Sequence, residues 1–399
     1  MRGARVLLAL AALPAWGAGL AGDPDGPLSL SGYYENQLTA QRIAGRTVLQ
    51  DSDRLRLDLA VQADARVTFA GDLVWRLYHG VRRISAFDLI PPAVVGGFAA
   101  EAGASVDQLR PGFEIPFEDE HFVDNAFASL CLGRLLLRVG KQQLAWGTGY
   151  TWNPTDLFQD KDILDPTYEK TGVGALRAEI GLGPEGRLVG LLTPGPDWQG
   201  TGRALRAAGH LGRFDVSASA VQRREDRAAY LTGTAGDERR RLAGADFAGQ
   251  VLGLGVWGEG AYSWMSASRD FGQYLLGADH TSEGGTYLIG EYYRNGRGRR
   301  GAAAYTFADW MRLLGSRGQN LGRDYAFLGV SRPARDLWTL SAYVVANLSD
   351  RSLLLLPWLE YSLGDNSELD AVGYLPAGGG RTEFGHFGAG GLARLRVYF

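Results

Sequence analysis

Apolar and polar residues alternate strictly along several segments of the chain. From residue 54 to residue 64 the odd positions are apolar and the even positions mostly polar, which places Leu55 and Leu57 on one face and Arg54 and Arg56 on the other. The same period of two recurs over 67–77, 176–182 and 214–220. Side chains of a β-strand point alternately to opposite faces, so the pattern predicts an all-β chain.

About 18 such strands are expected, with 16 as the nearest alternative. The alternation is weakest over 123–132 and 367–375. The expected strands start near residues 29, 53, 67, 123, 135, 173, 188, 203, 214, 240, 254, 271, 286, 324, 337, 352, 367 and 388.

The connections between these strands are of two kinds. Tight turns such as Gly133-Arg134 and Gly212-Arg213 alternate with longer polar stretches. A soluble β-sandwich also shows alternation, but it lacks this regular asymmetry. Short periplasmic turns and long outer loops are typical of a transmembrane antiparallel β-barrel, which we therefore expect. The longer stretches are 41–52, 79–122, 147–171, 224–239, 295–322 and 376–387.

The N-terminus has the pattern of a signal peptide. Arg2 and Arg5 precede the apolar run Val6 to Trp16, and small residues flank a cleavage point near Gly22. A buried N-terminal helix is the alternative. We expect a signal peptide over 1–21 and a single barrel domain over 22–399, which would be exported to the bacterial outer membrane.

The chain ends on an alternating segment. Gly391, Ala393, Leu395, Val397 and Phe399 share one face, and Arg394 and Arg396 lie on the other. An alternating final strand with an aromatic last residue looks like the signal read by the outer-membrane assembly machinery, which is thus an expected partner.

A narrower similarity lies in the segment Val139-Gly140-Lys141-Gln142-Gln143-Leu144-Ala145-Trp146-Gly147, followed by Asn153-Pro154-Thr155-Asp156. Several large porin-like families carry a comparable strand before a long outer loop. The mature chain as a whole resembles bacterial outer-membrane porins, without pointing to a particular member. The resemblance implies a barrel and a channel, and it says nothing about the solute.

Composition narrows the function further. The chain has 57 glycines and a net charge of −3, and without Arg2 and Arg5 it keeps 39 basic against 44 acidic residues. This mild, mixed charge does not predict a nucleic-acid partner. The single cysteine, Cys131, rules out a disulfide within the chain, and we expect no cofactor and no metal.

Charged side chains within the strands are expected to face the lumen, because a Lys or Arg at the lipid midplane costs about 2–4 kcal/mol. The lumen basic and acidic residues balance, so no ion preference follows. Arg54, Arg56, Arg394 and Arg396 come together if the barrel closes, either as a basic wall that attracts anions or, as we favour, paired with acids such as Asp58, Asp72 or Glu360. The predicted pore-lining residues are Arg54, Arg56, Asp58, Asp72, Arg76, Arg138, Arg177, Glu179, Arg206, Glu291, Glu360, Arg394 and Arg396.

Two long loops are candidates for narrowing the pore. The apolar content of 79–122 predicts that this loop folds inward as a constriction carrying Glu114, Glu118, Asp119 and Glu120; the alternatives are an external loop packed on its neighbours, or carboxylates that bind a divalent cation. The loop 147–171 has Tyr150, Trp152 and Tyr168, with Trp146 beside it, near Asp156, Asp160, Asp162 and Asp165. We interpret these as an outer aromatic girdle with solvated acids, rather than as a site for sugars or cations.

The expected function is passive diffusion of small hydrophilic solutes, and not an enzymatic reaction. Neither HExxH nor GxSxG occurs in the sequence. Two other classes stay open: a barrel component of an export or other envelope complex, and an outer-membrane hydrolase that uses His121 and His386. Outer-membrane lipid, lipopolysaccharide and further copies of the chain are the remaining expected partners.

Overall fold

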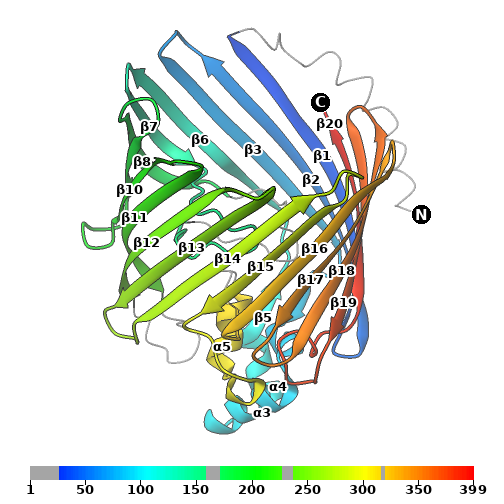
Figure 1. Cartoon of the computed structure of the whole chain (residues 1–399). Helices are drawn as coiled ribbons and strands as arrows, with labels where there is room; N and C mark the ends of the chain where they lie inside the picture. The colour runs from blue at the N-terminus through cyan, green and yellow to red at the C-terminus, as the bar shows by residue number, and fades with distance from the viewer. Residues whose placement is uncertain (1–26, 159–170, 227–236, 316–319) are drawn as a thin grey trace.

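The computed structural model describes residues 27–158, 171–226, 237–315 and 320–399. The expected signal peptide 1–21 lies outside these residues. Eighteen strands form one antiparallel sheet (Figure 1). They are β1 (Leu28–Ile43), β2 (Arg46–Gln62), β3 (Val67–Gly80), β6 (Glu120–Leu132), β7 (Leu135–Gln142), β8 (Val173–Gly181), β9 (Arg187–Thr193), β10 (Gly202–Leu211), β11 (Phe214–Asp226), β12 (Asp237–Val251), β13 (Leu254–Met265), β14 (Phe271–Thr281), β15 (Tyr287–Asn295), β16 (Asp324–Arg335), β17 (Trp338–Asn347), β18 (Ser352–Gly364), β19 (Ser367–Ala377) and β20 (Gly390–Tyr398).

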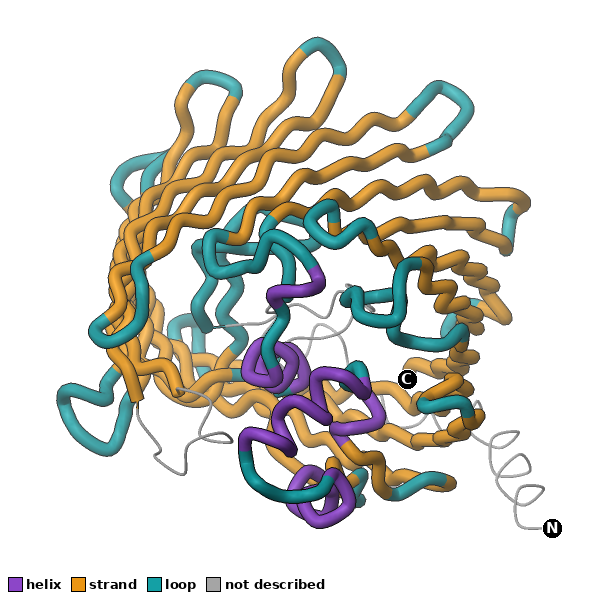
Figure 2. Tube along the Cα trace, turned by 90° about the horizontal axis from the view of Figure 1, so that it is seen from below, coloured by secondary structure: helices purple, strands orange, loops and turns teal. Residues whose placement is uncertain are grey.

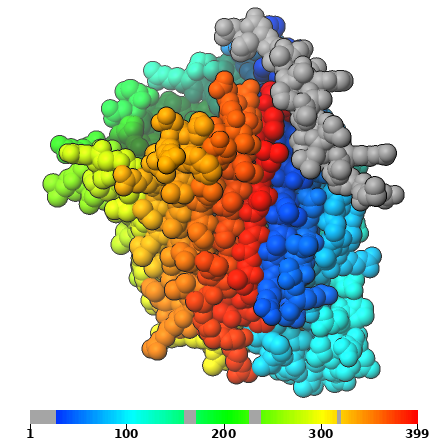
Figure 3. Space-filling view, turned by 90° about the vertical axis from the view of Figure 1, so that its right-hand side faces the viewer, coloured from blue at the N-terminus to red at the C-terminus, as the bar shows by residue number. Residues whose placement is uncertain are grey.

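The sheet closes on itself. β1 pairs with β2 along the chain and with β20 at the other end of the chain, where Tyr33 lies opposite Tyr398. The first and last strands therefore lie side by side (Figure 3). A closed barrel satisfies every backbone group of the sheet without leaving an edge. The expected antiparallel β-barrel of 18 strands is confirmed.

The two faces of the wall differ as the alternation predicts. Arg54 and Arg56 are only 4 % and 5 % exposed, whereas Leu59, Leu73 and Leu77 are 43 %, 43 % and 47 % exposed on the outside. Polar groups inside and apolar groups outside are the arrangement that a lipid environment requires. No helix among the described residues is long and apolar enough to cross a membrane.

The first hairpin corrects one expected loop. The stretch 41–52 was predicted to be a long connection, but β1 runs to Ile43 and β2 begins at Arg46. Ala44 and Gly45 both have positive φ, 48° and 81°, as a two-residue hairpin turn requires. The prediction was wrong because Asp51 and Asp53 face outward, so both faces of this part of the strand are polar and the alternation is lost.

Short helices gather at one mouth of the barrel, the end at which the long connections lie (Figures 1 and 2). The segment between β3 and β6 contains β4 (Arg83–Ser85), η1 (Ala86–Leu89), α3 (Pro92–Glu101), α4 (Val106–Leu109), η2 (Arg110–Phe113) and β5 (Glu114–Pro116). The segment between β15 and β16 contains η4 (Ala302–Ala304) and α5 (Phe307–Leu314). We call residues 81–119 and 296–315 together the mouth cap.

Candidate functional site: a loop anchored inside the barrel

The connection after β7 turns into the barrel, and we call its described part, residues 143–158, the lumen loop. Leu144 and Trp146 pack against Leu191, Val221 and Leu242, which lie on the inner faces of β9, β11 and β12. Figure 2 shows loops of this kind within the ring of strands. The lumen loop thus covers an apolar stretch of the inner wall.

Glu259 on β13 is the first anchor of the lumen loop. Its carboxylate accepts hydrogen bonds from Thr148 N at 3.0 Å, Thr155 N at 2.5 Å and Thr155 Oγ1 at 2.7 Å. Gly147 lies so close that a Cβ there would be 2.5 Å from Glu259 Oε2, and its φ of 88° also favours glycine. A buried carboxylate that accepts several such bonds is a strong local tether.

Glu291 on β15 is the second anchor. It accepts bonds from the backbone nitrogens of Tyr150 and Thr151, the latter at 2.7 Å, and from Trp257 Nε1 at 2.7 Å. Glu291 was predicted to line the pore; it does lie on the inner face, but it is only 3 % exposed because the lumen loop covers it. The two carboxylates together hold four backbone N–H groups of the loop.

Aromatic contacts fix the middle of the lumen loop. The Trp152 ring stacks on Tyr293 with ring centroids 5.0 Å apart, and its Nε1 donates to Asn320 Oδ1 at 2.9 Å. Tyr150 packs on Phe327 of β16, with centroids 5.3 Å apart. Side chains with few rotatable bonds, packed on both sides, define one position for the loop.

The opposite part of the inner wall carries paired charges. Arg56 contacts Asp58 at 2.6 Å, Asp72 at 2.6 Å and Asp124 at 2.7 Å. Near the closure of the barrel, Arg396 contacts Glu35 at 2.6 Å. Arg56, Arg394 and Arg396 of the hypothetical basic wall therefore have acidic partners, which is the arrangement that the sequence favoured.

The other predicted pore-lining residues also lie on the inner face, as the strand register shows. Arg177 pairs with Glu179 at 2.5 Å, Arg206 with Asp246 at 3.1 Å, and Arg394 with Asp370 at 3.5 Å. Their contribution to conduction stays a prediction. The register places Arg54 opposite Arg76 and Arg138 opposite Arg177. It places both Glu360 and Arg394 opposite Asp370, and Arg206 opposite the buried Val189.

Sequence reasoning missed three buried acids of this wall, Glu35, Asp124 and Asp370. Asp124 is the extra residue of a bulge, since Asp72 lies opposite Asn125 while Leu73 lies opposite Val123. The bulge breaks the period of two over 123–132, so the poor alternation there was itself the signal. Asp370 lies in β19, the other segment with poor alternation.

A closed 18-stranded sheet with a polar inner face and a loop anchored inside decides the fold. In fold, the chain is a porin-like β-barrel. No family model matches the chain, and no curated protein matches it.

Several solved structures are similar to this porin-like barrel at a distance. A complex of Salmonella typhi OmpF with daunomycin has 12 % identity and a TM-score of 0.47, covering 93 % of this chain and 97 % of the other. A triple mutant of Rhodopseudomonas blastica porin has 14 % identity and a TM-score of 0.44, covering 93 % and 100 %. A loop-deletion mutant of OmpT, an outer membrane protein of Vibrio cholerae, has 11 % identity and a TM-score of 0.44, covering 93 % and 99 %. With scores this low, the assignment of the fold rests on the strand pairing of the chain itself.

One prediction about the long loops of the porin-like barrel was wrong: the loop 143–158, expected on the outside, enters the lumen. The aromatic residues Trp146 and Trp152 are buried inside the barrel, so they do not form an outer girdle, and Asp156 is buried as well. Tyr168, Asp160, Asp162 and Asp165 lie outside the described residues.

The segment 79–122 buries its apolar residues in the mouth cap. Phe87, Ile90 and Val95 pack around Trp310 of α5, and the Phe98 ring stacks on Phe307 with centroids 4.0 Å apart. This local core buries the apolar side chains whose number had suggested an inward fold of the segment. The segment therefore packs at the mouth of the barrel, against α5 and against the inward-facing Ile43 and Val48 of β1 and β2, and its role as a constriction stays a prediction.

The four acids expected at the constriction are exposed at the mouth. Glu114 pairs with Arg83 at 3.3 Å, Asp119 with Arg82 at 2.8 Å and Glu120 with Arg76 at 2.7 Å. The backbone N–H of Tyr78 and the Arg82 guanidinium lower the pKa of Asp119. Within the described residues, no group of three His, Cys, Asp or Glu side chains is arranged to hold a metal ion.

The two histidines considered for a hydrolase lie in different surroundings. His121 is on β6 opposite Trp75, which faces outward. The His386 ring packs edge-on against Trp310 with centroids 5.9 Å apart, and burial lowers its pKa. Across the described parts of the chain, neither imidazole pairs with a carboxylate, so the geometry gives no support to a catalytic dyad.

A second carboxylate cluster fixes the connection between β19 and β20, residues 378–389, which we call the closing loop. Glu383 is buried and accepts hydrogen bonds from Tyr325 Oη and from Asn347 Nδ2, the latter at 2.6 Å. Its backbone N–H donates to Asp350 at 2.8 Å. Burial, helped by the charge of Asp350, raises the pKa of Glu383 from 4.5 to about 7, although its hydrogen bonds act in the opposite direction.

The raised pKa of Glu383 predicts a pH-dependent closing loop. Because folding favours the neutral carboxyl, its contribution to stability is complete below pH 4.5 and is lost as the pH rises through about 7. We expect hydrogen-exchange protection of 378–389 to fall between about pH 5 and about pH 8 after correction for intrinsic exchange. Glu383→Gln keeps the shape without the ionisation, so its protection should not change in this way; an equal fall in the variant would contradict the prediction.

Proposed function

We propose that the protein is an outer-membrane channel through which small hydrophilic solutes diffuse passively. The observation that carries this proposal is the lumen loop, which two buried carboxylates hold against the inner wall of a closed barrel with an apolar exterior. Its described part, 143–158, docks on one side of the lumen, over β9, β11–β13, β15 and β16, and so narrows the passage there. The remaining inner wall combines the ion pairs around Arg56 and Arg396 with an apolar patch of Leu354, Leu356, Val372 and Leu392 on β18 to β20.

The orientation follows from the two ends of the barrel. The start of β1, the end of β20 and the tight turns at 133–134, 212–213 and 252–253 lie at one end, which would face the periplasm, and the mouth cap would face outward. Export through the signal peptide 1–21 and recognition of the strand that ends in Phe399 by the assembly machinery belong to the same proposal. They explain how a barrel of this kind reaches its membrane.

The charge pairing supports weak ion selectivity. Arg56 and Arg396 have carboxylate partners within 2.6 Å, which largely cancels their long-range field. A solute crossing the lumen therefore meets paired charges with little net field. The proposed solutes are small and hydrophilic, and their class stays open to experiment.

Single-channel recording on purified full-length protein tests the proposal. In a planar bilayer we expect stable openings with similar permeability to anions and cations, and in liposomes we expect swelling with small sugars that falls as the sugar size increases. Liposomes without protein are the control. Absence of both conductance and swelling in correctly folded protein would overturn the proposal.

A further inference from the structure

The outer wall has an apolar groove of about 850 Å³ across β8 to β12. Outward-facing Ala178, Gly190, Ala220 and Ala243 form its floor, and larger side chains such as Leu205 border it. Short side chains next to long ones hollow out the wall. A space of this size is within the range of ligand-binding clefts.

Two arginines lie at the outer end of this groove. Arg203 is the second residue of β10, and Arg241 is the fifth residue of β12; both strands run from the mouth end toward the turn end. Trp264, next to the last residue of β13, lines the groove at the same level. Trp at a membrane–water boundary lies at the level of the lipid headgroups. The two arginines therefore lie at the depth of the lipid headgroups, and the apolar groove next to them could hold a lipid acyl chain.

Within the described residues, neither guanidinium group has an acidic partner. Arg203 lies over the Trp198 ring, 3.8 Å from its centroid, and donates to the Trp198 carbonyl at 2.5 Å. Arg241 forms neither an ion pair nor a side-chain hydrogen bond with any described residue. Several inner-wall arginines, such as Arg56, Arg206 and Arg396, are in contrast paired with carboxylates. Cations that face lipid without a partner are suited to an anionic headgroup.

We propose that this groove binds one outer-leaflet lipid with a phosphorylated headgroup. An acyl chain would lie along Ala220 and Ala243, and the phosphate would contact Arg203 and Arg241. Arginine presents parallel N–H donors that match phosphate oxygens. The inference rests on the membrane placement in the proposed function, but not on conduction.

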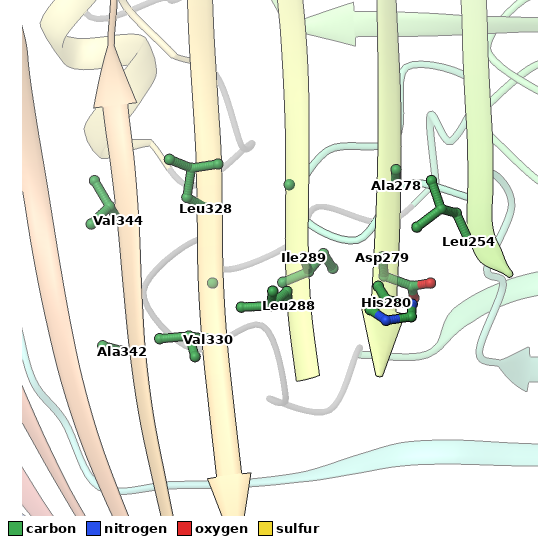
Figure 4. A pocket seen from close by; sticks show the side chains of 12 residues that line it. Leu254, Ala278, Asp279, His280, Leu288, Ile289, Leu328, Val330, Ala342 and Val344 are labelled. Carbon is green, nitrogen blue, oxygen red and sulfur yellow. The ribbon is translucent and has the colours of Figure 1, made fainter. Parts of the chain in front are cut away.

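A second groove on the same wall serves as an internal comparison. It has a volume of about 490 Å³ and lies over β13 to β17 (Figure 4). Leu288 and His280 mark it as close to the turn end of the barrel, because β15 begins at Tyr287 and β14 ends at Thr281. No arginine lines it. If an apolar hollow alone were sufficient, both grooves would hold lipid equally well.

Native mass spectrometry and thermal unfolding of the full chain in detergent test the proposal. The probes are a diphosphorylated lipid A, the same glycolipid without its phosphates, and inorganic phosphate. We expect retention and stabilisation with the first probe only. The double variant Arg203→Gln with Arg241→Gln should weaken binding at least about tenfold. Arg332→Gln is the matched control, since Arg332 is an outward, exposed arginine toward the turn end of β16 and outside both grooves.

A third variant tests the groove itself. Ala243→Trp fills the floor and leaves both arginines in the sequence, and we expect it to lose lipid binding. Equal binding of the phosphate-free glycolipid, unchanged binding by the double variant, or binding of inorganic phosphate alone would overturn the proposal. So would disulfide formation between two copies of Ala220→Cys in lipid-free protein, because a second barrel would then occupy the groove. Conductance is recorded in parallel: lost lipid binding with intact conductance refutes this inference only, and absent conductance with intact lipid binding refutes the channel only.

Discussion

Replacing both Glu259 and Glu291 with glutamine is expected to release the lumen loop and to raise the single-channel conductance. Each carboxylate accepts two backbone N–H bonds from the loop, and each bond to a charged group contributes about 1.5–3 kcal/mol. The amide of glutamine turns one acceptor into a donor that faces these N–H groups. The apolar contacts of Trp146 and Trp152 would remain, so we expect fluctuating current and not a barrel that fails to form.

The measurement is planar-bilayer recording of the double variant and of each single variant. Glu360→Gln is the matched control, because Glu360 is also an inner-face carboxylate but is exposed and has no contact with the lumen loop. Its current noise should equal that of the unmodified protein, because the substitution changes a lumen charge without releasing the loop. A double variant with unchanged conductance and unchanged current noise would show that the loop does not restrict the passage.

Arg56→Ala should destabilise the barrel strongly. Arg56 joins three carboxylates, and its side chain is 7 % exposed, with Asp124 at 3 % and Asp72 at 13 %. Removal of one partner from a buried ionic group leaves uncompensated charge, which costs about 3–5 kcal/mol. The unpaired carboxylates should also shift the channel toward cations.

Urea unfolding in lipid vesicles and reversal potentials in a salt gradient measure the two effects. Arg76→Ala is the control, because its partner Glu120 is 44 % exposed and such a pair contributes about 0–1 kcal/mol. Arg56→Lys should recover the selectivity but only part of the stability, since an ammonium group cannot reach three carboxylates as the guanidinium does. Equal losses of unfolding free energy for Arg56→Ala and Arg76→Ala would contradict the expectation that the buried ion pair contributes more than the exposed one.

Period-two alternation predicted the strands well, because it reports directly on which face of a strand meets lipid. Of the 18 strand starts, 17 were predicted within about three residues; the exception is β2, which begins at Arg46. The exception has a physical reason: near the mouth, Asp51 and Asp53 face outward, so the strand extends past the apolar band and no longer alternates. Arg203 and Arg241 face outward at the same end of the barrel, so charge indicates the inner face only within that band.

The positions of the loops could not be predicted in the same way. A loop rich in apolar residues must bury them, but sequence does not say against which partner. The segment 79–122 packs against α5 around Trp310, whereas the lumen loop packs against the inner faces of β9, β11 and β12. Period-two alternation places Glu259 on the inner face, but its binding to Thr148 and Thr155 depends on contacts between residues more than a hundred positions apart.

The seam between β1 and β20 has a consequence for the order of assembly. Arg396 and Glu35, which are 361 positions apart, form an ion pair across it, and the backbone of Phe399 bonds to Gly32. The first strand therefore has no partner on one side until the last residues of the chain have been delivered. Until then β1 and β19 are open edges that another chain could pair with. Closure has to be the final step, and a chain shortened by one strand would expose both edges permanently, so aggregation rather than a smaller barrel is its expected fate.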